Sequence, residues 1–337
     1  MEQDMGRFIR GIGVVAVCAF VSACGAAASG ITAAAAKTVV SDYNAANTKA
    51  NNALDVALQN QHEEGASALI DNAYYQEFKL MGQKSEGGTY AAPKWSTAVY
   101  PATTQGWPKY FLADVRTTSK PAAPPQLFLF AQDARNASWR VLYEVPIGSL
   151  ANPILVPQVA ESQGTIPVSN AGNTSMLTAF ASYRSNYTNA SSSKFAGGEF
   201  TSGWNLKTQT QFAGLRTNGS VSVSCTYEGK YQPLELPLAN GGTLVFAIFQ
   251  TVDSVKMQSQ FYLQQPASRS VLPAFLAPGA YSAMTITQLD EVAFVIPKGS
   301  GKIQVIGDYG GIIKATGTKT STSSGTPSGT TTLSWNG

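Results

Sequence analysis

The sequence predicts an α+β protein made of two tandem units, each with helices followed by a curved antiparallel sheet. Stretches in which apolar residues recur three and four positions apart precede runs of strand-like character. This order of elements occurs twice, which indicates an internal duplication. The chain has 337 residues, more than one core usually serves, so its length also favours two domains. We expect the units to span residues 37–147 and 173–316.

The first unit begins with a helix that we predict from about residue 37 to Gln61. Its apolar stripe has helical spacing and includes Val39, Tyr43 and Ala50. A second, shorter helix follows Gly65, and glycines within residues 82–88 end it.

Three strands follow these helices, each rich in Phe, Leu, Val and Tyr. They cover residues 110–117, 126–132 and 139–147. Prolines or a polar turn separate them, so the connections are short. Consecutive strands with short connections predict an antiparallel meander.

Residues 148–172 are rich in Pro, Gly, Ser and Asn and read as an inter-domain linker. A helix over residues 174–188 opens the second unit, and residues 199–212 predict a helical or irregular cover. Strands are then predicted at residues 220–227, 234–238, 243–251, 255–263, 284–289, 291–296, 302–306 and 310–315.

Each unit is expected to have its own core. In the first, Tyr43, Ala50 and Leu54 should contact the strand residues Phe128, Phe130 and Val141. In the second, the helix residues Met176, Phe180, Tyr183 and Tyr187 should contact Val221, Val223 and Cys225. The segments Gln126–Ala131 and Gly242–Ala247 have a similar texture and are each expected in the middle of a meander.

Residues 317–337 are rich in Gly, Ser and Thr and low in apolar side chains. Such a segment cannot bury enough surface to offset its ordering entropy. We therefore expect a disordered tail.

The N-terminus reads as a secretion address over residues 1–23. Two arginines precede an apolar run that is too short for a bilayer core needing about 20 residues. The run ends in Val21-Ser22-Ala23-Cys24, which resembles the lipobox of bacterial lipoproteins. The resemblance implies that Cys24 carries a diacylglycerol with palmitate-type chains, followed by a tether over residues 24–36. The alternative is an ordinary secretion signal cut near Ala27 or Ala28.

Composition excludes several classes of partner. The net charge is +3 and only 13% of the residues are charged, so no basic surface argues for nucleic acid or for electrostatic membrane binding. Once Cys18 leaves with the signal and Cys24 is lipidated, Cys225 has no disulfide partner. Its place on the alternating face of a strand favours a buried apolar filler over a reactive thiol.

The order of elements, together with Pro108–Ala113 and Ser138–Val141, resembles a family of uncharacterised actinobacterial lipoproteins over about Thr38–Ala315. These carry two halves like the cystatin-like cone of the nuclear transport factor 2 superfamily. The resemblance implies two cones whose open ends hold a ligand. It carries over no catalytic residue, and the near absence of histidine departs from the Asp/His enzymes of that superfamily.

Three candidate sites are rejected on chemistry. His62 is the sole histidine and is expected as a solvated residue at a helix C-terminus. Residues 297–302 resemble a phosphate loop but lack its first Gly and its Ser or Thr, so a hairpin turn is expected. Asp290 and Glu291 are neighbours in a strand and point to opposite faces, so they cannot act as a carboxylate pair. No catalytic, cofactor or metal residue is therefore predicted.

Aromatic residues near the expected cone mouths are the remaining functional signal. Core or covering roles are favoured over a binding surface for Trp95, Tyr100, Trp107, Tyr110, Trp204 and Tyr231.

The sequence thus favours a non-enzymatic, lipid-anchored protein on the outer face of the cell membrane. It would bind or scaffold an envelope protein or an apolar small molecule. The alternative is a hydrolase or isomerase-like enzyme, which would need a buried carboxylate with a perturbed pKa in a cone pocket.

Overall fold

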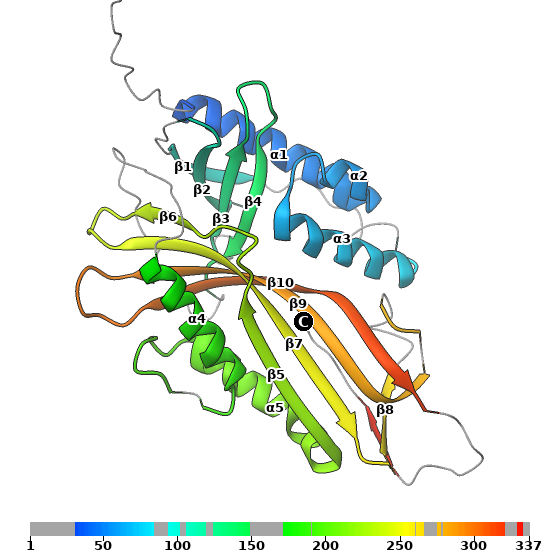
Figure 1. Ribbon diagram of the computed structural model, residues 1–337. Coiled ribbons are helices and arrows are strands. Elements are labelled where there is room, and N and C mark those ends of the chain that lie inside the picture. The colour runs from blue at the N-terminus through cyan, green and yellow to red at the C-terminus, as the bar shows by residue number, and fades with distance from the viewer. Residues whose placement is uncertain are drawn as a thin grey trace, which may run out of the picture.

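The computed structural model describes residues 31–83, 94–101, 106–118, 124–148, 171–189, 191–259, 261–265, 275–277, 279–320 and 329–332. The predicted signal, Cys24 and nearly all of the predicted linker lie outside these residues. The fold is α+β, as predicted, with two sheets whose neighbouring strands are antiparallel except for one pair (Figure 1). Each half has its own sheet, which agrees with a tandem arrangement. The comparison with cystatin-like cones stays a prediction.

The first half has three helices, α1 (Ala33–Ala53), α2 (Val56–Gln59) and α3 (Gly65–Leu80). The hydroxyl of Thr32 caps α1 by accepting a hydrogen bond from the Ala35 N–H at 3.2 Å, and Leu54 ends it in the left-handed region. Asp55 caps α2 in the same way. The helix predicted to Gln61 is therefore interrupted where Leu54 turns the chain.

The small sheet has the order β1-β2-β3-β4. Its strands are β1 (Trp95–Pro101), β2 (Lys109–Thr117), β3 (Gln126–Gln132) and β4 (Arg140–Pro146). Three of them were predicted. The edge strand β1 was missed, because its alternation of half-buried and exposed residues gives a weak apolar signal.

The core under α1 agrees only in part with expectation. Tyr43 packs with Phe128, Phe130 and Val141 as predicted. Ala50 and Leu54 do not reach the sheet; they pack with Tyr75 of α3. The expected contact fails because α2 and α3 turn back over the end of α1.

The second half contains α4 (Ala171–Ser185), a π-helical turn η1 (Glu199–Gly203) and α5 (Trp204–Asn218). The helical cover expected near residues 199–212 is confirmed. In the large sheet β7 lies between β5 and β9, β10 pairs with the other edge of β9, and β6 pairs with β7. The strands are β5 (Gly219–Tyr227), β6 (Leu234–Pro237), β7 (Thr243–Met257), β8 (Phe261–Gln265), β9 (Gly279–Ile296) and β10 (Gln304–Lys319).

Two predicted pairs of strands are in fact single long strands. Residues 284–289 and 291–296 belong to β9, and residues 302–306 and 310–315 fall mostly within β10. The pairing of β9 with β10 continues through register shifts at Val305/Gly307 and Ile312/Lys314. Such shifts disturb the local alternation of apolar residues, so the sequence pattern predicts two strands where there is one.

Part of the segment predicted to be a disordered tail is strand. Residues 317–319 complete β10, and β11 (Gly329–Thr332) pairs parallel with β8. Composition alone cannot detect a partner strand, and here it misled.

The middle of the large sheet is buried on both faces. Along β7, Leu244, Phe246 and Ile248 face the first half, while the alternate residues Val245, Ala247 and Phe249 face α4. Figure 1 shows α4 and α5 on one face of this sheet, with α3 and the small sheet on the other.

The residues facing the first half form a core that both halves share, in addition to the clusters that each half has for itself. The expected cores of the two halves are therefore present, but they are joined by a third. This shared core contains Ala66, Ile70, Leu112, Leu127, Leu129, Tyr143, Val145, Ile147, Leu234, Leu236, Leu238, Leu244, Phe246, Ile248, Leu289, Ala293 and Ile306. On the other face, the predicted packing of Met176 and Phe180 with Cys225, and of Tyr187 with Val223, is confirmed.

Candidate binding pocket

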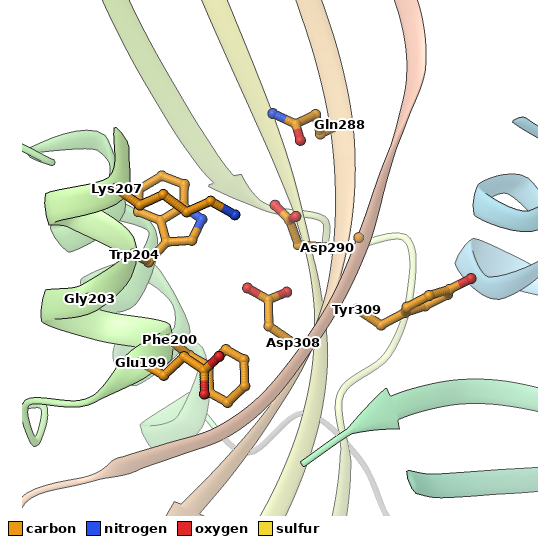
Figure 2. A pocket seen from close by; sticks show the side chains of 10 residues that line it. Glu199, Phe200, Gly203, Trp204, Lys207, Gln288, Asp290, Asp308 and Tyr309 are labelled. Atoms are coloured by element: carbon orange, nitrogen blue, oxygen red, sulfur yellow. The ribbon is translucent and has the colours of Figure 1, made fainter. Parts of the chain in front are cut away.

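A cavity of about 440 Å³ lies between the helices of the second half and strands β9 and β10. Figure 2 shows the side chains of η1 and α5 on one side and those of the strands on the other. The lining residues are Glu199, Phe200, Gly203, Trp204, Lys207, Gln288, Asp290, Asp308, Tyr309 and Gly310. The volume is within the range of small-molecule sites.

Strand alternation places two carboxylates in this cavity. Asp290 of β9 and Asp308 of β10 point towards the helices, whereas the side chain of Tyr309 points away, towards the first half. Asp290 pairs in register with Gly310, where a Cβ would collide with the carboxylate. A glycine is therefore needed opposite Asp290.

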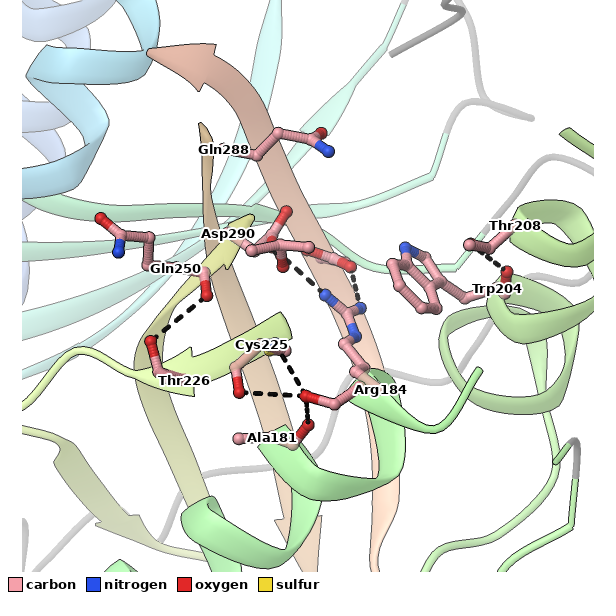
Figure 3. A network of polar contacts seen from close by, with 12 residues as sticks. Ala181, Arg184, Trp204, Thr208, Cys225, Thr226, Gln250, Gln288 and Asp290 are labelled. Atoms are coloured by element: carbon pink, nitrogen blue, oxygen red, sulfur yellow. Dashed lines mark hydrogen bonds and ion pairs between the residues drawn. The ribbon is translucent and has the colours of Figure 1, made fainter. Parts of the chain in front are cut away.

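Arg184 of α4 is fully buried next to two of the lining residues, Asp290 and Asp308. Its Nη2 contacts Asp308 Oδ2, and its Nη1 lies 3.5 Å from Asp290 Oδ2. The guanidinium lies 4.9 Å from the ring centroid of Phe180 and 4.7 Å from that of Trp204. Figure 3 shows the guanidinium directed at Asp290 beside the indole of Trp204.

The pKa values of the buried acids are raised around this arginine. Burial and the charge of Asp308 raise the pKa of Asp290 to about 6, although Arg184 and a 2.8 Å hydrogen bond from Thr251 act in the opposite direction. Burial and Asp290 raise the pKa of Asp253 on β7 to about 7. Burial alone would lower the pKa of Arg184, but Asp308 and Asp290 raise it above its ordinary value.

Several buried polar atoms of the second half have no hydrogen-bond partner within the protein. They are Arg184 Nε and Nη1, Asp308 Oδ1, Asp253 Oδ1, Asn205 Oδ1, Gln211 Nε2 and the Tyr187 hydroxyl. Buried polar groups are normally satisfied by protein, water or ligand. One of these residues, Asp308, lines the pocket, and Arg184 is its ion-pair partner, so the pocket suits a polar occupant.

The helix side of the pocket starts in the π-helical turn η1, which brings Glu199 and Phe200 to the cavity. Single π-helical turns are rare and are frequently found at functional sites. α5 follows without interruption and contributes Trp204 and Lys207.

The prediction that Asp290 and Glu291 point to opposite faces is confirmed. Glu291 faces the first half, where its Oε1 accepts a hydrogen bond from the Ser67 hydroxyl and its Oε2 one from the Glu144 N–H, both at 2.7 Å. Burial raises the pKa of Glu291 to about 8.

Glu63 belongs, with Tyr43, Ser67, Glu144 and Glu291, to a cluster of hydrogen-bonded side chains between the halves, which we call the polar junction. It accepts a 2.6 Å hydrogen bond from the Tyr43 hydroxyl, and burial raises its pKa well above the ordinary value. The sequence placed Glu63 at a polar helix end and so missed its burial.

The other rejected or minor candidates are placed as follows. Residues 297–302 connect β9 to β10, so the predicted hairpin turn is confirmed. His62 is half-buried rather than solvated, because its backbone oxygen accepts a 2.8 Å hydrogen bond from the Val141 N–H and so holds the residue against β4. Burial lowers the pKa of its imidazole. Cys225 is buried, and burial raises its pKa to about 12, which confirms the apolar filler.

Trp204 is the aromatic residue from the sequence-based set that lines the pocket. Core roles fit four of the others: Trp95 packs under α1, and Tyr100, Tyr110 and Tyr231 pack against the shared core. Trp107 is 44% exposed. The sequence missed Arg184 and Asp308, because their convergence depends on the pairing of β9 with β10.

Within the described residues, no three His, Cys, Asp or Glu side chains are grouped so that they could hold a metal ion. In the same part of the chain, no helix has both the length and the apolar character needed to cross a membrane.

Comparison with known proteins gives a family and one curated relative. Residues 27–317 match the model of a domain of unknown function, DUF8094. Over 224 residues, the chain is 28% identical to an uncharacterised lipoprotein of Streptomyces coelicolor. The match covers 64% of this chain and 65% of the relative, just under two thirds of the latter's length. No solved structure matches. The expected resemblance to uncharacterised actinobacterial lipoproteins is confirmed.

Proposed function

The chain belongs to the family of the domain of unknown function DUF8094, and on that premise we propose that it is a lipid-anchored cell-envelope protein that binds a small molecule in the pocket of its second half. The observation that carries the proposal is the cavity itself, which is lined by Asp290 and Asp308 with the buried Arg184 next to them and with an unsatisfied oxygen on Asp308. A non-enzymatic binding role requires such a cavity but no catalytic group.

The anchoring part of the proposal rests on the lipobox-like Val21–Cys24 and on a relative that is named a lipoprotein. A diacyl group supplies two chains, each contributing about 0.8 kcal/mol per buried methylene, which is enough for stable attachment. The protein would then lie on the outer face of the cell membrane.

We expect Cys24→Ser to release a soluble, folded protein, because the lipid would be its only attachment. Fractionation of cells labelled with palmitate measures this, with Cys225→Ser as the control that should stay labelled and membrane-bound. Label that persisted in Cys24→Ser would contradict lipidation at this residue.

The lining of the pocket changes the kind of ligand expected. The sequence favoured an apolar molecule, but three carboxylates and a lysine line the cavity beside Phe200 and Trp204. A small molecule with both polar and apolar parts fits this lining better. The concave, partly polar cavity also favours a small molecule over a protein surface.

The binding role is tested by blocking the pocket from α5. Lys207 lines the cavity, whereas its neighbour Leu206 is 61% exposed to solvent. Lys207→Trp should therefore fill the cavity, and Leu206→Trp is the matched control. In a thermal-unfolding screen of polar metabolites, we expect ligands to raise the melting temperature of wild type and Leu206→Trp but not of Lys207→Trp. Equal shifts in all three proteins, or no shift with any compound, would overturn the proposal.

Acid–base catalysis is the second candidate function, favoured by one observation. Asp290 is a buried pocket carboxylate whose pKa is raised to about 6, close to the value that suits a general acid or base. Arg184 and Thr251 already contact Oδ2 of this carboxylate, which makes it less free to exchange a proton with a ligand. We therefore prefer a binding function to a catalytic one. Chemical conversion of a pocket ligand by wild type, abolished in Asp290→Asn, would establish a hydrolase or isomerase-like activity instead.

A further inference from the structure

We propose that the pocket selects an organic cation, a small molecule that places one ammonium group beside Asp308 and Asp290 and an apolar part against Phe200 and Trp204. This inference rests on the proposed binding function and specifies the class of its ligand.

The charges around the cavity leave one negative charge in excess. Asp290 and Asp308 share the single guanidinium of Arg184 beneath them. Of the other lining residues, Glu199 and Lys207 carry opposite charges. Because the cavity is partly enclosed, this charge is screened less than it would be on an open surface.

The excess charge coincides with an acceptor that has no donor. Asp308 Oδ2 is engaged by Arg184, but Asp308 Oδ1 is buried without any hydrogen-bond partner. On the neighbouring strand, Asp290 Oδ2 already accepts a hydrogen bond from the Thr251 hydroxyl and lies 3.5 Å from Arg184 Nη1. Figure 2 shows the carboxylate of Asp308 directed into the cavity. An ammonium group there would supply both the missing donor and the missing charge.

The helix side of the cavity offers aromatic surface next to these carboxylates. Trp204 already holds one cation, Arg184, against its ring at 4.7 Å. Phe200 lies on the same side of the cavity. Carboxylates opposite aromatic rings form an environment suited to ammonium groups attached to an apolar body.

Other occupants fit this site less well. An anion would face three carboxylates, Glu199, Asp290 and Asp308. A divalent metal ion would need a third protein ligand, and the described residues hold no such group. A neutral alcohol could satisfy Asp308 Oδ1 but would leave the charge uncompensated.

Binding of a cation should also depend on pH. Protonation of Asp290, whose pKa is about 6, removes the excess negative charge, so affinity should fall as the pH drops below 6. The titratable and charged groups around Asp290 are Arg184 on α4, Glu199 on η1, Lys207 on α5, Cys225 on β5, Asp253 on β7 and Asp308 on β10. Asp253, with a pKa of about 7, reinforces the effect.

The test is isothermal titration calorimetry of the full chain with four probes, which have in common either a phenyl group or a positive charge. They are phenethylammonium, butylammonium, 2-phenylethanol and phenylacetate. We expect the two cations to bind, and the neutral and anionic probes to bind at least tenfold more weakly. Lowering the pH from 7.5 to 5 should weaken cation binding about tenfold, since Asp290 is then mostly protonated.

Asp308→Asn should weaken binding of the cations tenfold or more, while Lys207→Gln, which removes a positive charge from the same lining, should strengthen it. Glu199→Gln, at the edge of the cavity, provides a variant that keeps the Arg184 contacts intact and should weaken cation binding by a smaller factor. Thermal unfolding of each variant checks that it is folded.

Preferential binding of phenylacetate or 2-phenylethanol, blocked by Lys207→Trp, would overturn the cation assignment and leave the binding function standing. If neither cation binds, the cation assignment is also overturned. Failure of the binding function itself would show separately, because the metabolite screen would then contain no ligand whose binding is blocked by Lys207→Trp.

Discussion

Arg184 shows how a single side chain sets the energetics of the second half. A buried guanidinium without counter-ions would cost several kcal/mol. Here Asp308 and Asp290 compensate the charge, and the rings of Phe180 and Trp204 lie against the guanidinium. The same compensation makes the two carboxylates dependent on the arginine.

Replacing Arg184 by Met should therefore destabilise the fold by about 3–5 kcal/mol near pH 8, since both aspartates would be left buried without a cation. The loss should be smaller at pH 5, where Asp290, with a pKa of about 6, is already protonated in the folded state. Urea denaturation at the two pH values measures this.

The matched control is Arg216→Met on α5, an exposed arginine whose guanidinium lies 4.7 Å from the ring centroid of Tyr187. It should cost about 1 kcal/mol or less at either pH. Equal losses at pH 5 and pH 8 for Arg184→Met would show that the aspartates are not the source of the effect.

The sequence could predict only some of these site residues. Strand alternation separates Asp290 from Glu291 without any structure, and Trp204 stands out by its type. Asp308 could not be predicted, because it meets Asp290 only through the pairing of β9 with β10, which contains register shifts. Arg184 lies next to Tyr183 on an amphipathic helix, where an arginine is ordinarily solvated.

At the scale of elements, β7 contains a nearly continuous apolar run, Leu244–Phe249, within an antiparallel sheet. Antiparallel strands with one wet face alternate apolar and polar residues, and a continuous run is typical of burial on both faces. The run was correctly predicted as strand. Periodicity does not say what covers a face, so the packing of the first half against this sheet could not be predicted.

Glycines mark where the elements of the two halves approach most closely. A Cβ on Gly307 of β10 would lie 2.5 Å from Val145 Cγ1 and 2.6 Å from the Pro146 oxygen of the first half. Gly307 also forms a bridge with Ile147, next to a register shift in β10. The backbone itself is therefore the contact surface here.

Gly307→Ala should destabilise the protein by about 1–3 kcal/mol, because the contact cannot open without shifting β4 from β10. Gly214→Ala, on the exposed side of α5 with nothing within 4 Å of its Cβ, should instead stabilise by about 0.5–1 kcal/mol. Chemical denaturation of both variants measures the difference. A neutral Gly307→Ala would mean that the halves are not in tight contact at this point.

At the scale of the whole molecule, the shared core makes the two halves one folding unit. The polar junction lies beside this core and joins α1, α3, β4 and β9 through Tyr43, Glu63, Ser67, Glu144 and Glu291. Unfolding of either half would expose apolar surface on the other, so a single cooperative transition is expected.

The junction should make stability depend on pH. The folded state holds the Glu291 proton up to a pKa of about 8, whereas the unfolded chain releases it near 4.5, so stability should fall as the pH rises through that window. Glu291→Gln cannot ionise, and its amide can still accept a hydrogen bond from the Glu144 N–H while its NH2 group donates to the Ser67 hydroxyl. It should be more stable than wild type by roughly 2–4 kcal/mol at pH 8.5 and nearly equal to it at pH 4.5.

Thermal and urea unfolding across pH 4.5–8.5 measure the two curves, with the surface variant Glu228→Gln as the control that should follow wild type. Parallel curves for wild type and Glu291→Gln would contradict the assignment of the pH dependence to this residue. Two separate transitions in wild type would contradict the single folding unit.

The strand β9 carries both of these roles on consecutive residues, with Asp290 in the pocket and Glu291 in the junction. Loss or gain of a single residue in the middle of this strand would exchange the two faces of everything beyond it. A carboxylate would then enter the apolar interface, and apolar side chains of the opposite face such as Leu289 or Ala293 would turn to the pocket side. Because β7 and β10 fix β9 on both edges, the strand has no free side to which it could slip. Family members should therefore vary in the loops around β9 and keep the length of the strand itself unchanged.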